Sequence, residues 1–182
     1  MKVGELIEML AEYQQQGKEV WLELGLQSAN NHTLKRINRG HDFAAFQQAL
    51  ARAHQHGLKV CAHLILGLPG EGPDDYMASL NAVLEEQVAG IKLHPLHVVD
   101  GSSMAKAWRA GRLSVMTQAD YVEQAVRLIR HTPPQVVYHR VSAHAHPPVL
   151  LAPEWCQNKW LALTAIAKKL ASEGPQGSAL SR

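Results

Sequence analysis

Cysteine is scarce in this sequence. The 182 residues contain two, Cys61 and Cys156, which lie far apart. No secretory leader precedes them, so nothing points to an oxidising compartment or to a disulfide framework. We therefore expect a reducing, cytoplasmic setting.

Long apolar runs and an excess of one charge are also missing. No stretch approaches the roughly eighteen apolar residues of a membrane-spanning helix, so no membrane partner is expected. The 18 Lys and Arg residues nearly balance the 16 Asp and Glu residues. The net charge of +2 predicts no strong sequence-independent attraction to nucleic acid or to acidic membranes. A hydrophobic share of 46% is enough for one ordinary folded core.

What the sequence does contain is a repeated pattern, in which a helical stretch leads through a glycine into a β-rich run. The pattern occurs three times, with helix and strand at 5–16 and 19–25, at 42–56 and 58–66, and at 73–87 and 91–97. Gly17, Gly57 and Gly90 stand where a helix end needs a left-handed residue. Asp42 is placed as an N-cap and Pro73 as a first-turn proline.

This order of elements predicts an α/β fold, namely a partial (βα) barrel with parallel strands and outer helices. Three parallel strands cannot close a barrel, and the first would leave an unpaired hydrophobic edge. We therefore expect the N-terminal barrel strands to be missing from this sequence and to be supplied upstream or by another chain. Self-association through the exposed sheet edge is the alternative.

The pattern changes after His97. Helices are predicted at 102–110 and 117–130, and a strand at 135–141 after two prolines. These elements predict an appended α/β extension rather than another barrel unit.

A loop rich in His and Pro then leads to a final predicted helix at 153–171. Trp155, Trp160, Leu161 and Leu163 on this helix are expected to cover a core, although an aromatic binding surface is the alternative. The expected domains are 1–100 for the partial barrel, 101–173 for the extension and 174–182 for a flexible polar tail.

Polar side chains close the first predicted strand, and reactive residues of parallel barrels gather at such C-terminal strand ends. Glu23, Gln27 and Ser28 lie there, and Arg39 follows. An Arg can hold a carboxylate through two parallel hydrogen bonds, and a Gln can both donate to and accept from sugar hydroxyls. The alternative is an ordinary strand end followed by a surface helix with scattered charge.

The second predicted strand opens into a glycine-rich turn at 67–71, where a flat ring could approach the backbone closely. This turn lacks the spacing and the lysine of a phosphate loop. Cys61, His63 and Ile65 alternate along the strand, so they share one face, either the barrel lumen or the helix layer. Cys61 itself is expected to be a small core residue.

Eleven histidines raise a metal hypothesis. His94 and His97 end the third strand, and His139, His144 and His146 follow. No nearby carboxylate completes a known zinc arrangement, and a proline between the first two histidines excludes the helical version. A histidine-metal hydrolase is therefore the least favoured function.

Four motifs taken together resemble the fourth, fifth and sixth strand regions of radical S-adenosylmethionine (SAM) proteins. They are Glu-Leu-Gly-Leu-Gln-Ser at 23–28, Lys-Arg-Ile-Asn-Arg-Gly at 35–40, His-Leu-Ile-Leu-Gly-Leu-Pro-Gly-Glu at 63–71 and Gly-Ile-Lys-Leu-His-Pro-Leu-His at 90–97. Residues 91–142 resemble an extension shared by a bacterial subfamily of unassigned substrate and the catalytic subunit of the tRNA-modifying elongator complex. That likeness alone suggests RNA as a partner.

The resemblance implies two cofactors, SAM and a 4Fe-4S cluster. Family members hold the cluster with three cysteines of a Cys-x-x-x-Cys-x-x-Cys-type loop, which leaves one iron for SAM. One electron then cleaves the sulfonium bond and yields a 5′-deoxyadenosyl radical. Cys61 and Cys156 match nothing in that loop, so we expect a radical SAM protein whose cluster ligands are absent from this chain and which is inactive alone. A non-enzymatic remnant or interaction module is the alternative.

The same resemblance assigns roles on the SAM side. Gln27 corresponds to a residue that contacts the ribose, and Arg39 to the arginine that binds the methionine carboxylate, with Glu23 and Ser28 as neighbours. His63 stands where related coproporphyrinogen oxidases carry a ribose-binding aspartate. The adenine-contacting positions correspond to Ile65 and to the backbone near Leu96.

Overall fold

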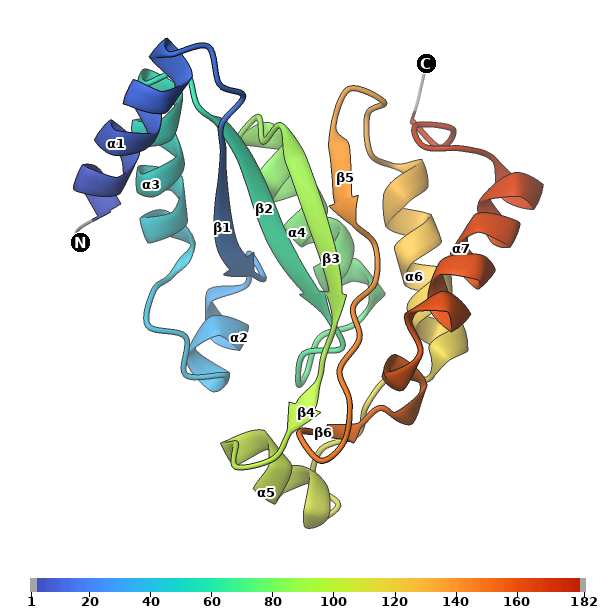
Figure 1. Ribbon diagram of the computed structural model, residues 1–182. Coiled ribbons are helices and arrows are strands. Elements are labelled where there is room, and N and C mark those ends of the chain that lie inside the picture. The colour runs from blue at the N-terminus through green and yellow to red at the C-terminus, as the bar shows by residue number, and fades with distance from the viewer. Residues whose placement is uncertain (1–2, 181–182) are drawn as a thin grey trace.

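A four-stranded parallel sheet forms the centre of the computed structural model, which describes residues 3–180. Its order is β1 (Trp21–Gln27), β2 (Lys59–Leu66), β3 (Gly90–Pro95) and β5 (Val137–Arg140). All three neighbouring pairs are parallel (Figure 1). The expected partial barrel of parallel strands with outer helices is confirmed.

Helices cover one side of this sheet. In Figure 1, α4 lies behind β2 and β3, α1 and α3 flank β1, α6 flanks β5, and α7 lies outside α6. The helices are α1 (Val3–Gln15), α2 (Asn31–Arg36), α3 (Phe43–Gln55), α4 (Pro73–Glu85), α5 (Ser103–Arg109), α6 (Gln118–Arg130) and α7 (Lys159–Glu173), with a 3₁₀ turn, η1 (Glu154–Gln157), before the last.

Local signals fix most helix ends as the sequence predicts. The Asp42 side chain accepts a hydrogen bond from the Ala45 amide, and Gly17 and Gly57 adopt φ angles of 79° and 68° after their helices. The prediction for Gly90 is wrong. Gln87 takes the left-handed position after α4, with φ 58°, and Gly90 is already the first residue of β3.

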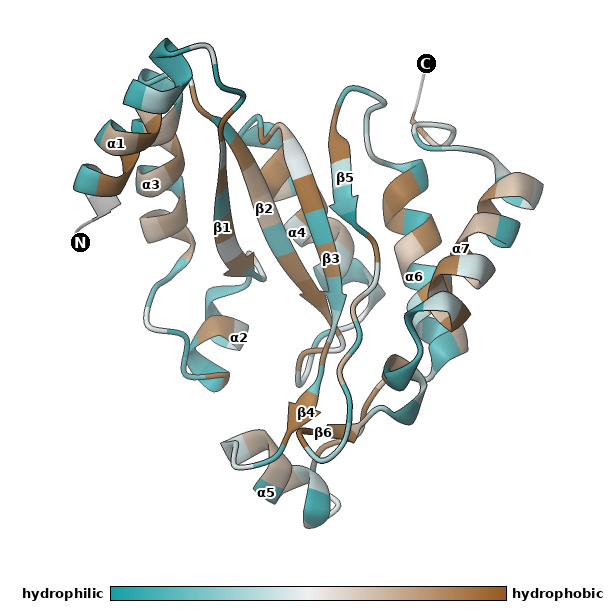
Figure 2. Cartoon of the chain, viewed as in Figure 1, coloured by the Kyte–Doolittle hydropathy of each residue, from teal (hydrophilic) through white to brown (hydrophobic). Residues whose placement is uncertain are grey.

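The strands have an apolar face and a polar face, and hydrophobic and hydrophilic residues alternate along β2 and β3 in Figure 2. Val60, Ala62, Leu64 and Leu66 of β2 are all buried and belong to the main core beneath the helices. The opposite, concave face carries Glu23, His63 and Lys92, which contact one another.

The sheet is strongly curled. Strands lie about 4.8 Å apart, so β1 and β5 would be separated by roughly 14 Å in a flat sheet. Yet the rings of Trp21 on β1 and His139 on β5 have centroids 4.3 Å apart. Side chains from the two edge strands therefore meet across the concave face, as in a segment of a barrel.

The expectation that residues after His97 add no further barrel unit is wrong for the strand at 135–141. β5 pairs in parallel with β3, because α6 serves as the crossover helix that a parallel connection needs. An appended part does exist: β4 (Val98–Val99) pairs antiparallel with β6 (Leu150–Ala152), next to α5. The domain boundaries at 100 and 173 stay a prediction.

The polar tail packs against the turn after α6, and its expected flexibility stays a prediction. The Gln176 side-chain amide donates to the carbonyls of Pro133 and Val136 at 2.8 Å each, and the Ala179 amide donates to the Arg130 carbonyl at 2.9 Å. These bonds join the tail to the last residue of α6 and to the turn that follows it. Residues 181 and 182 lie outside the described part.

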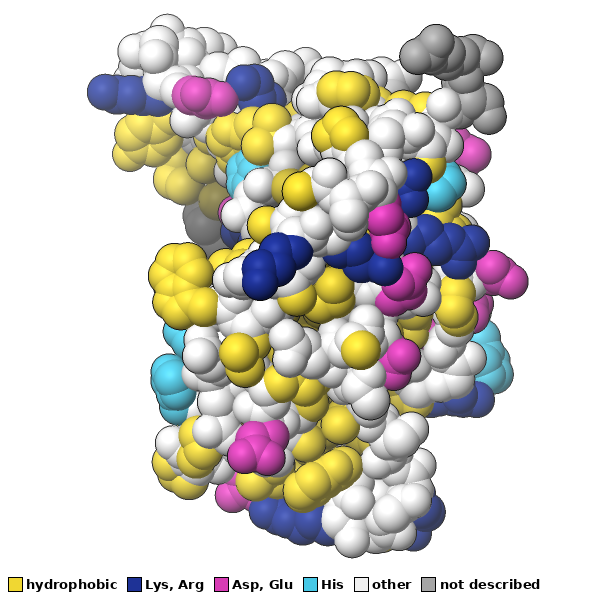
Figure 3. Space-filling model, turned by 90° about the vertical axis from the view of Figure 1, so that its right-hand side faces the viewer, with side chains coloured by type: hydrophobic (Ala, Val, Ile, Leu, Met, Phe, Trp, Pro, Cys, Tyr) yellow, Lys and Arg dark blue, Asp and Glu magenta, His cyan; other side chains and the backbone are white. Residues whose placement is uncertain are grey.

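The last helix begins later than predicted, at Lys159, and only some of its aromatic side chains cover core. The Trp155 ring in η1 packs 5.3 Å from the Tyr121 ring, whereas Trp160 is 64% exposed and Leu161 is also exposed. On the side of the molecule where α7 lies (Figure 3), hydrophobic side chains are interspersed with basic and acidic ones.

Candidate functional site

Glu23 is the centre of charge on the concave face. Lys92 of β3 donates a hydrogen bond to one carboxylate oxygen, His63 of β2 lies 3.0 Å from the other, and His139 of β5 lies 3.8 Å away. The hydrogen bond from Lys92 lowers the pKa of Glu23. One carboxylate thus holds partners from three strands, so Glu23 acts as an internal counter-ion.

Gln27 and Arg39 converge over Gly25, in the middle of β1. A Cβ atom at Gly25 would lie 2.6 Å from Gln27 Nε2 and 3.0 Å from Arg39 Nη2. The missing side chain is what lets the two polar groups approach the strand. Glu23, Gly25 and Arg39 also line a common cavity of about 300 Å³ along β1.

Arg39 keeps most of its hydrogen-bonding capacity. Its Nη2 donates to the Gly25 carbonyl at 2.7 Å and its Nε to His41 Nε2 at 3.3 Å. A guanidinium has five N–H donors, so three remain for a ligand. The two bonds that are made fix the orientation of an otherwise exposed side chain.

Gln27 has an unusual backbone. Its φ angle is 76°, and the register between β1 and β2 shifts between Leu24 and Gln27. Residues other than glycine pay about 1 kcal/mol or more for this conformation, and such outliers gather at binding sites. The Gln27 side chain has no hydrogen-bond partner within residues 3–180, so it is free to bind a ligand.

Ser28 does not join this group. Its side chain is 1% exposed, donates to the Glu71 carboxylate and accepts from the Asn30 amide. Burial raises the pKa of Glu71, while the bond from Ser28 opposes that rise. Ser28 therefore ties the end of β1 to the loop after β2 and has no free group for a ligand.

Of the two faces that the sequence leaves open for His63, the barrel lumen and the helix layer, the structure shows the lumen. His63 and the carboxylate of Glu23 meet there, and burial lowers the pKa of His63 against the raising effect of Glu23. Cys61 is fully buried at the floor of the same face, opposite Glu23 in the strand register. Burial raises the pKa of its thiol to about 11, so the prediction of a core role is confirmed.

Ile65 and Leu96 lie at the C-terminal end of the sheet. Ile65 is half-buried and stands beside His94 in the register between β2 and β3. The Leu96 amide donates to the Leu66 carbonyl at 2.9 Å, and its side chain is buried. The Leu96 amide is thus occupied by the sheet, while Ile65 presents an apolar surface on the concave face.

The glycine-rich turn at 67–71 is approached closely by the protein's own side chains and also lines a cavity of about 360 Å³. A Cβ atom at Gly67 would meet the Met116 side chain at 2.9 Å, and one at Gly70 would collide with the Arg36 guanidinium. Arg36 also donates to the Pro69 carbonyl at 3.1 Å. The glycines accommodate the protein's own side chains here.

No group of three His, Cys, Asp or Glu residues that could hold a metal ion occurs in the part of the chain that the structure describes. Within the same residues, 3–180, none of the helices has both the length and the apolar character needed to cross a membrane.

Two family models match the chain in succession. The model of the Radical SAM superfamily matches residues 2–83, and that of the Radical SAM C-terminal domain matches residues 88–172. This chain belongs to the radical SAM superfamily. The family expected from the four motifs is confirmed, and the C-terminal model accounts for the extension.

A curated relative is similar over almost the whole chain. Protein YhcC of Escherichia coli K12 is 56% identical over 177 residues, which cover 97% of this chain and 57% of YhcC. YtqA of Bacillus subtilis is 36% identical over 93% of this chain and 52% of its own length. The chain thus spans little more than half the length of these relatives.

A solved structure shows the same fold at low identity. The archaeal Methanocaldococcus infernus Elp3 with an N-terminal deletion superposes with a TM-score of 0.80 at 20% identity, over 96% of this chain and 39% of that protein. The likeness to an elongator subunit is thereby confirmed at the level of fold. RNA as a partner stays a prediction.

The residues present fit one radical SAM cofactor and not the other. Gln27 and the three free donors of Arg39, at the glycine gap in β1, match the hydroxyl and carboxylate groups of SAM. A 4Fe-4S cluster needs three thiolates, and this sequence has two cysteines. Both are buried thiols, and burial raises the pKa of Cys156 to about 12.

Sequence reasoning missed several residues that contact the predicted SAM-binding residues Glu23, Gln27 and Arg39. Gly25 could have been found, because a glycine inside a strand often marks a close approach. His41 and Lys92 gave no such signal, since their roles depend on contacts with Arg39 and Glu23 that only the fold creates.

Proposed function

We propose that these 182 residues form the SAM-binding side of a radical SAM enzyme and that the cluster-binding thiolates come from sequence outside them. The convergence of Gln27 and Arg39 over Gly25 carries the proposal. When bound, SAM would supply the radical chemistry of the family through its sulfonium group.

Each residue has a defined task in this proposal. Arg39, oriented by Gly25 and His41, clamps the methionine carboxylate with its free N–H groups. Gln27 hydrogen-bonds the ribose. Ile65 offers an apolar contact to the adenine. Glu23 does not reach out to the ligand but balances the charge of Lys92, and His63 is held by the same carboxylate.

The two cysteines are the reason for proposing that the cluster-binding thiolates come from sequence outside these residues. The family's cluster loop supplies three closely spaced thiolates, whereas this sequence has two cysteines, which lie far apart and are both buried. Without the cluster, the chain alone would bind SAM weakly and would not carry out the reaction. The structure of Streptococcus suis SuiB bound to S-adenosylmethionine has the same fold, with a TM-score of 0.54 at 12% identity over 76% of this chain and 30% of SuiB.

SAM binding by the isolated chain tests the assignment. We expect saturable shifts of backbone amide NMR signals at 24–28 and 39–41 when SAM is added. Arg39→Lys keeps the charge but loses the two-pronged geometry, and should weaken binding roughly tenfold, as should Gln27→Ala. Arg52→Lys, on the exposed face of α3, is the control. Shifts elsewhere, or equal effects of Arg39→Lys and Arg52→Lys, would contradict the assignment.

A second proposal concerns the free edge of β1, which has one neighbour, β2, in the described sheet. We propose that this edge pairs with further barrel strands, either from the remainder of a YhcC-like protein or from a second copy of the chain. Sedimentation of the purified chain at rising concentration should show reversible dimers if copies pair. A monomer at all concentrations would exclude pairing between copies.

A further inference from the structure

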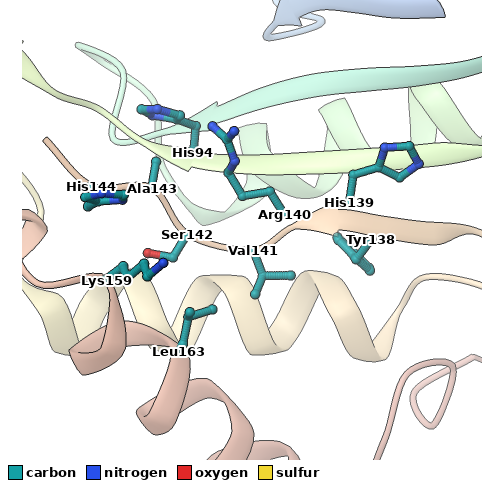
Figure 4. A pocket seen from close by; sticks show the side chains of 10 residues that line it. All are labelled: His94, Tyr138, His139, Arg140, Val141, Ser142, Ala143, His144, Lys159 and Leu163. Atoms are coloured by element: carbon teal, nitrogen blue, oxygen red, sulfur yellow. The ribbon is translucent and has the colours of Figure 1, made fainter. Parts of the chain in front are cut away.

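A second pocket lies away from the predicted SAM site along β1, between the end of β5 and the start of α7 (Figure 4). Its volume is about 550 Å³. The polar side chains that line it come from three segments: His94 from β3, Arg140 and Ser142 from β5 and the loop after it, His144 from that loop, and Lys159 from α7. It adjoins the proposed SAM site, because His94 stands beside Ile65 in the sheet.

The pocket is positively charged. No Asp or Glu lines it, and neither Arg140 nor Lys159 forms an ion pair with any carboxylate in residues 3–180. Burial lowers the pKa of His94, and the charge of Arg140 adds to that effect. Glu23, which lies 3.8 Å from the pocket residue His139, is already held by Lys92 and His63.

One buried polar atom in the wall of this pocket has no partner, and a second lies next to His94, behind the wall. Ser142 is 7% exposed and lines the pocket, and its hydroxyl makes no hydrogen bond. His97 Nε2 is likewise buried and unpaired, and the His97 ring packs 4.6 Å from the ring of His94. Among the described residues, these are the buried side-chain polar atoms that lack a partner. Such groups are rare because each costs free energy unless a ligand or water satisfies it.

The local backbone explains why these groups meet. The register between β3 and β5 shifts so that Ile91 pairs with Tyr138 but Lys92 pairs with Arg140. The extra residue, His139, forms a bulge that turns Arg140 toward the concave face beside Lys92. On the other wall, the Asn158 side chain accepts from the Trp160 amide and caps α7, which fixes Lys159 as the first residue of a 15-residue helix. The positive end of that helix adds to the field of the pocket.

We propose that this pocket binds an oxyanion, a phosphate or carboxylate group of the substrate. Arg140 and Lys159 supply the charge, and the free Ser142 hydroxyl donates the hydrogen bond that it lacks in the protein alone. The role as a substrate anchor rests on the proposed radical SAM function. The binding of an oxyanion does not, because it requires neither SAM nor the cluster.

Titration of the ¹⁵N-labelled chain with inorganic phosphate and, separately, with acetate tests the proposal, with ionic strength held constant by sodium chloride. We expect saturable shifts of amide signals at 140–144 and 158–160 with at least one ion. The ion that binds more tightly identifies the chemistry of the substrate group. Lys159→Gln and Ser142→Ala should each weaken that binding roughly tenfold.

Lys168→Gln is the matched control, since Lys168 is an exposed lysine on the same helix that does not line the pocket. It should leave the affinity unchanged, and the spectrum of each variant shows whether it is folded. Failure of both ions to bind at these residues, or an equal loss in Lys168→Gln and Lys159→Gln, would overturn the proposal. The anion titration contains no SAM. A failed SAM titration would therefore contradict the proposed function without contradicting anion binding at this pocket.

Discussion

His97 should make the folded chain sensitive to mild acid. The ring is half-buried against His94, and its Nε2 atom has no hydrogen-bond partner in residues 3–180. Burial, together with the nearby His94 and His144, lowers the pKa of His97 from 6.5 to about 4. The unfolded chain therefore binds more protons than the folded chain between these two values, and stability falls as the pH falls through that window.

The size of the effect follows from the two pKa values. With 6.5 in the unfolded state and about 4 in the folded state, linkage gives a loss of about 2 kcal/mol in the free energy of unfolding between pH 7 and pH 5. His63 and His94 also have lowered pKa values and act in the same direction. The contribution of His97 must therefore be isolated by substitution.

Urea unfolding at pH 7 and pH 5, followed by circular dichroism, measures it. His97→Phe removes the titrating group, so this variant should lose about 2 kcal/mol less than the wild type between the two pH values. Any constant packing cost of the larger ring cancels in that difference. His56→Gln, at an exposed position after α3, should follow the wild type. Parallel losses in the wild type and in His97→Phe would refute the reasoning.

Three further outcomes are expected. Gln27→Gly should raise the free energy of unfolding by up to about 1 kcal/mol in urea, because it relieves a φ angle of 76°; a loss would mean that the side chain holds the strand end together. Ser28→Ala should cost about 1–3 kcal/mol, since it removes one of the two side-chain hydrogen bonds, from Ser28 and Thr33, to the half-buried carboxylate of Glu71, and the Ser28→Ala, Glu71→Gln double variant should recover part of this. Lys92→Met should raise the pKa of Glu23 in an NMR titration; an unchanged value would show that Lys92 is not its main partner.

The sequence was sufficient wherever short-range chemistry decides the structure. The cap at Asp42, the left-handed glycines 17 and 57 and the three βα units all depend on neighbours within one turn or one strand. Gly90 shows the limit: both Gln87 and Gly90 follow α4, and only packing against Trp21 and Val137 reveals that the close approach at position 90 requires glycine.

Long-range contacts could not be predicted. β5 looked like part of an appendage because its pairing with β3 depends on how α6 packs, which no local pattern encodes. The site shows the same division. The motif and the strand position predict Gln27 and Arg39 as site residues. The Ser28 hydroxyl, in contrast, donates its hydrogen bond to Glu71, 43 residues away, and no local pattern predicts that contact. The unpaired hydroxyl of Ser142 likewise appears only when β5 and α7 come together.

We propose above that residues of this chain bind SAM and that cysteines outside this sequence bind the 4Fe-4S cluster. Anaerobic reconstitution of the purified chain with iron and sulfide, followed by iron and acid-labile sulfide determination and EPR spectroscopy, tests it most directly. With only Cys61 and Cys156 present, both buried, the account predicts no stoichiometric 4Fe-4S cluster. A stable cluster on this chain alone would contradict it.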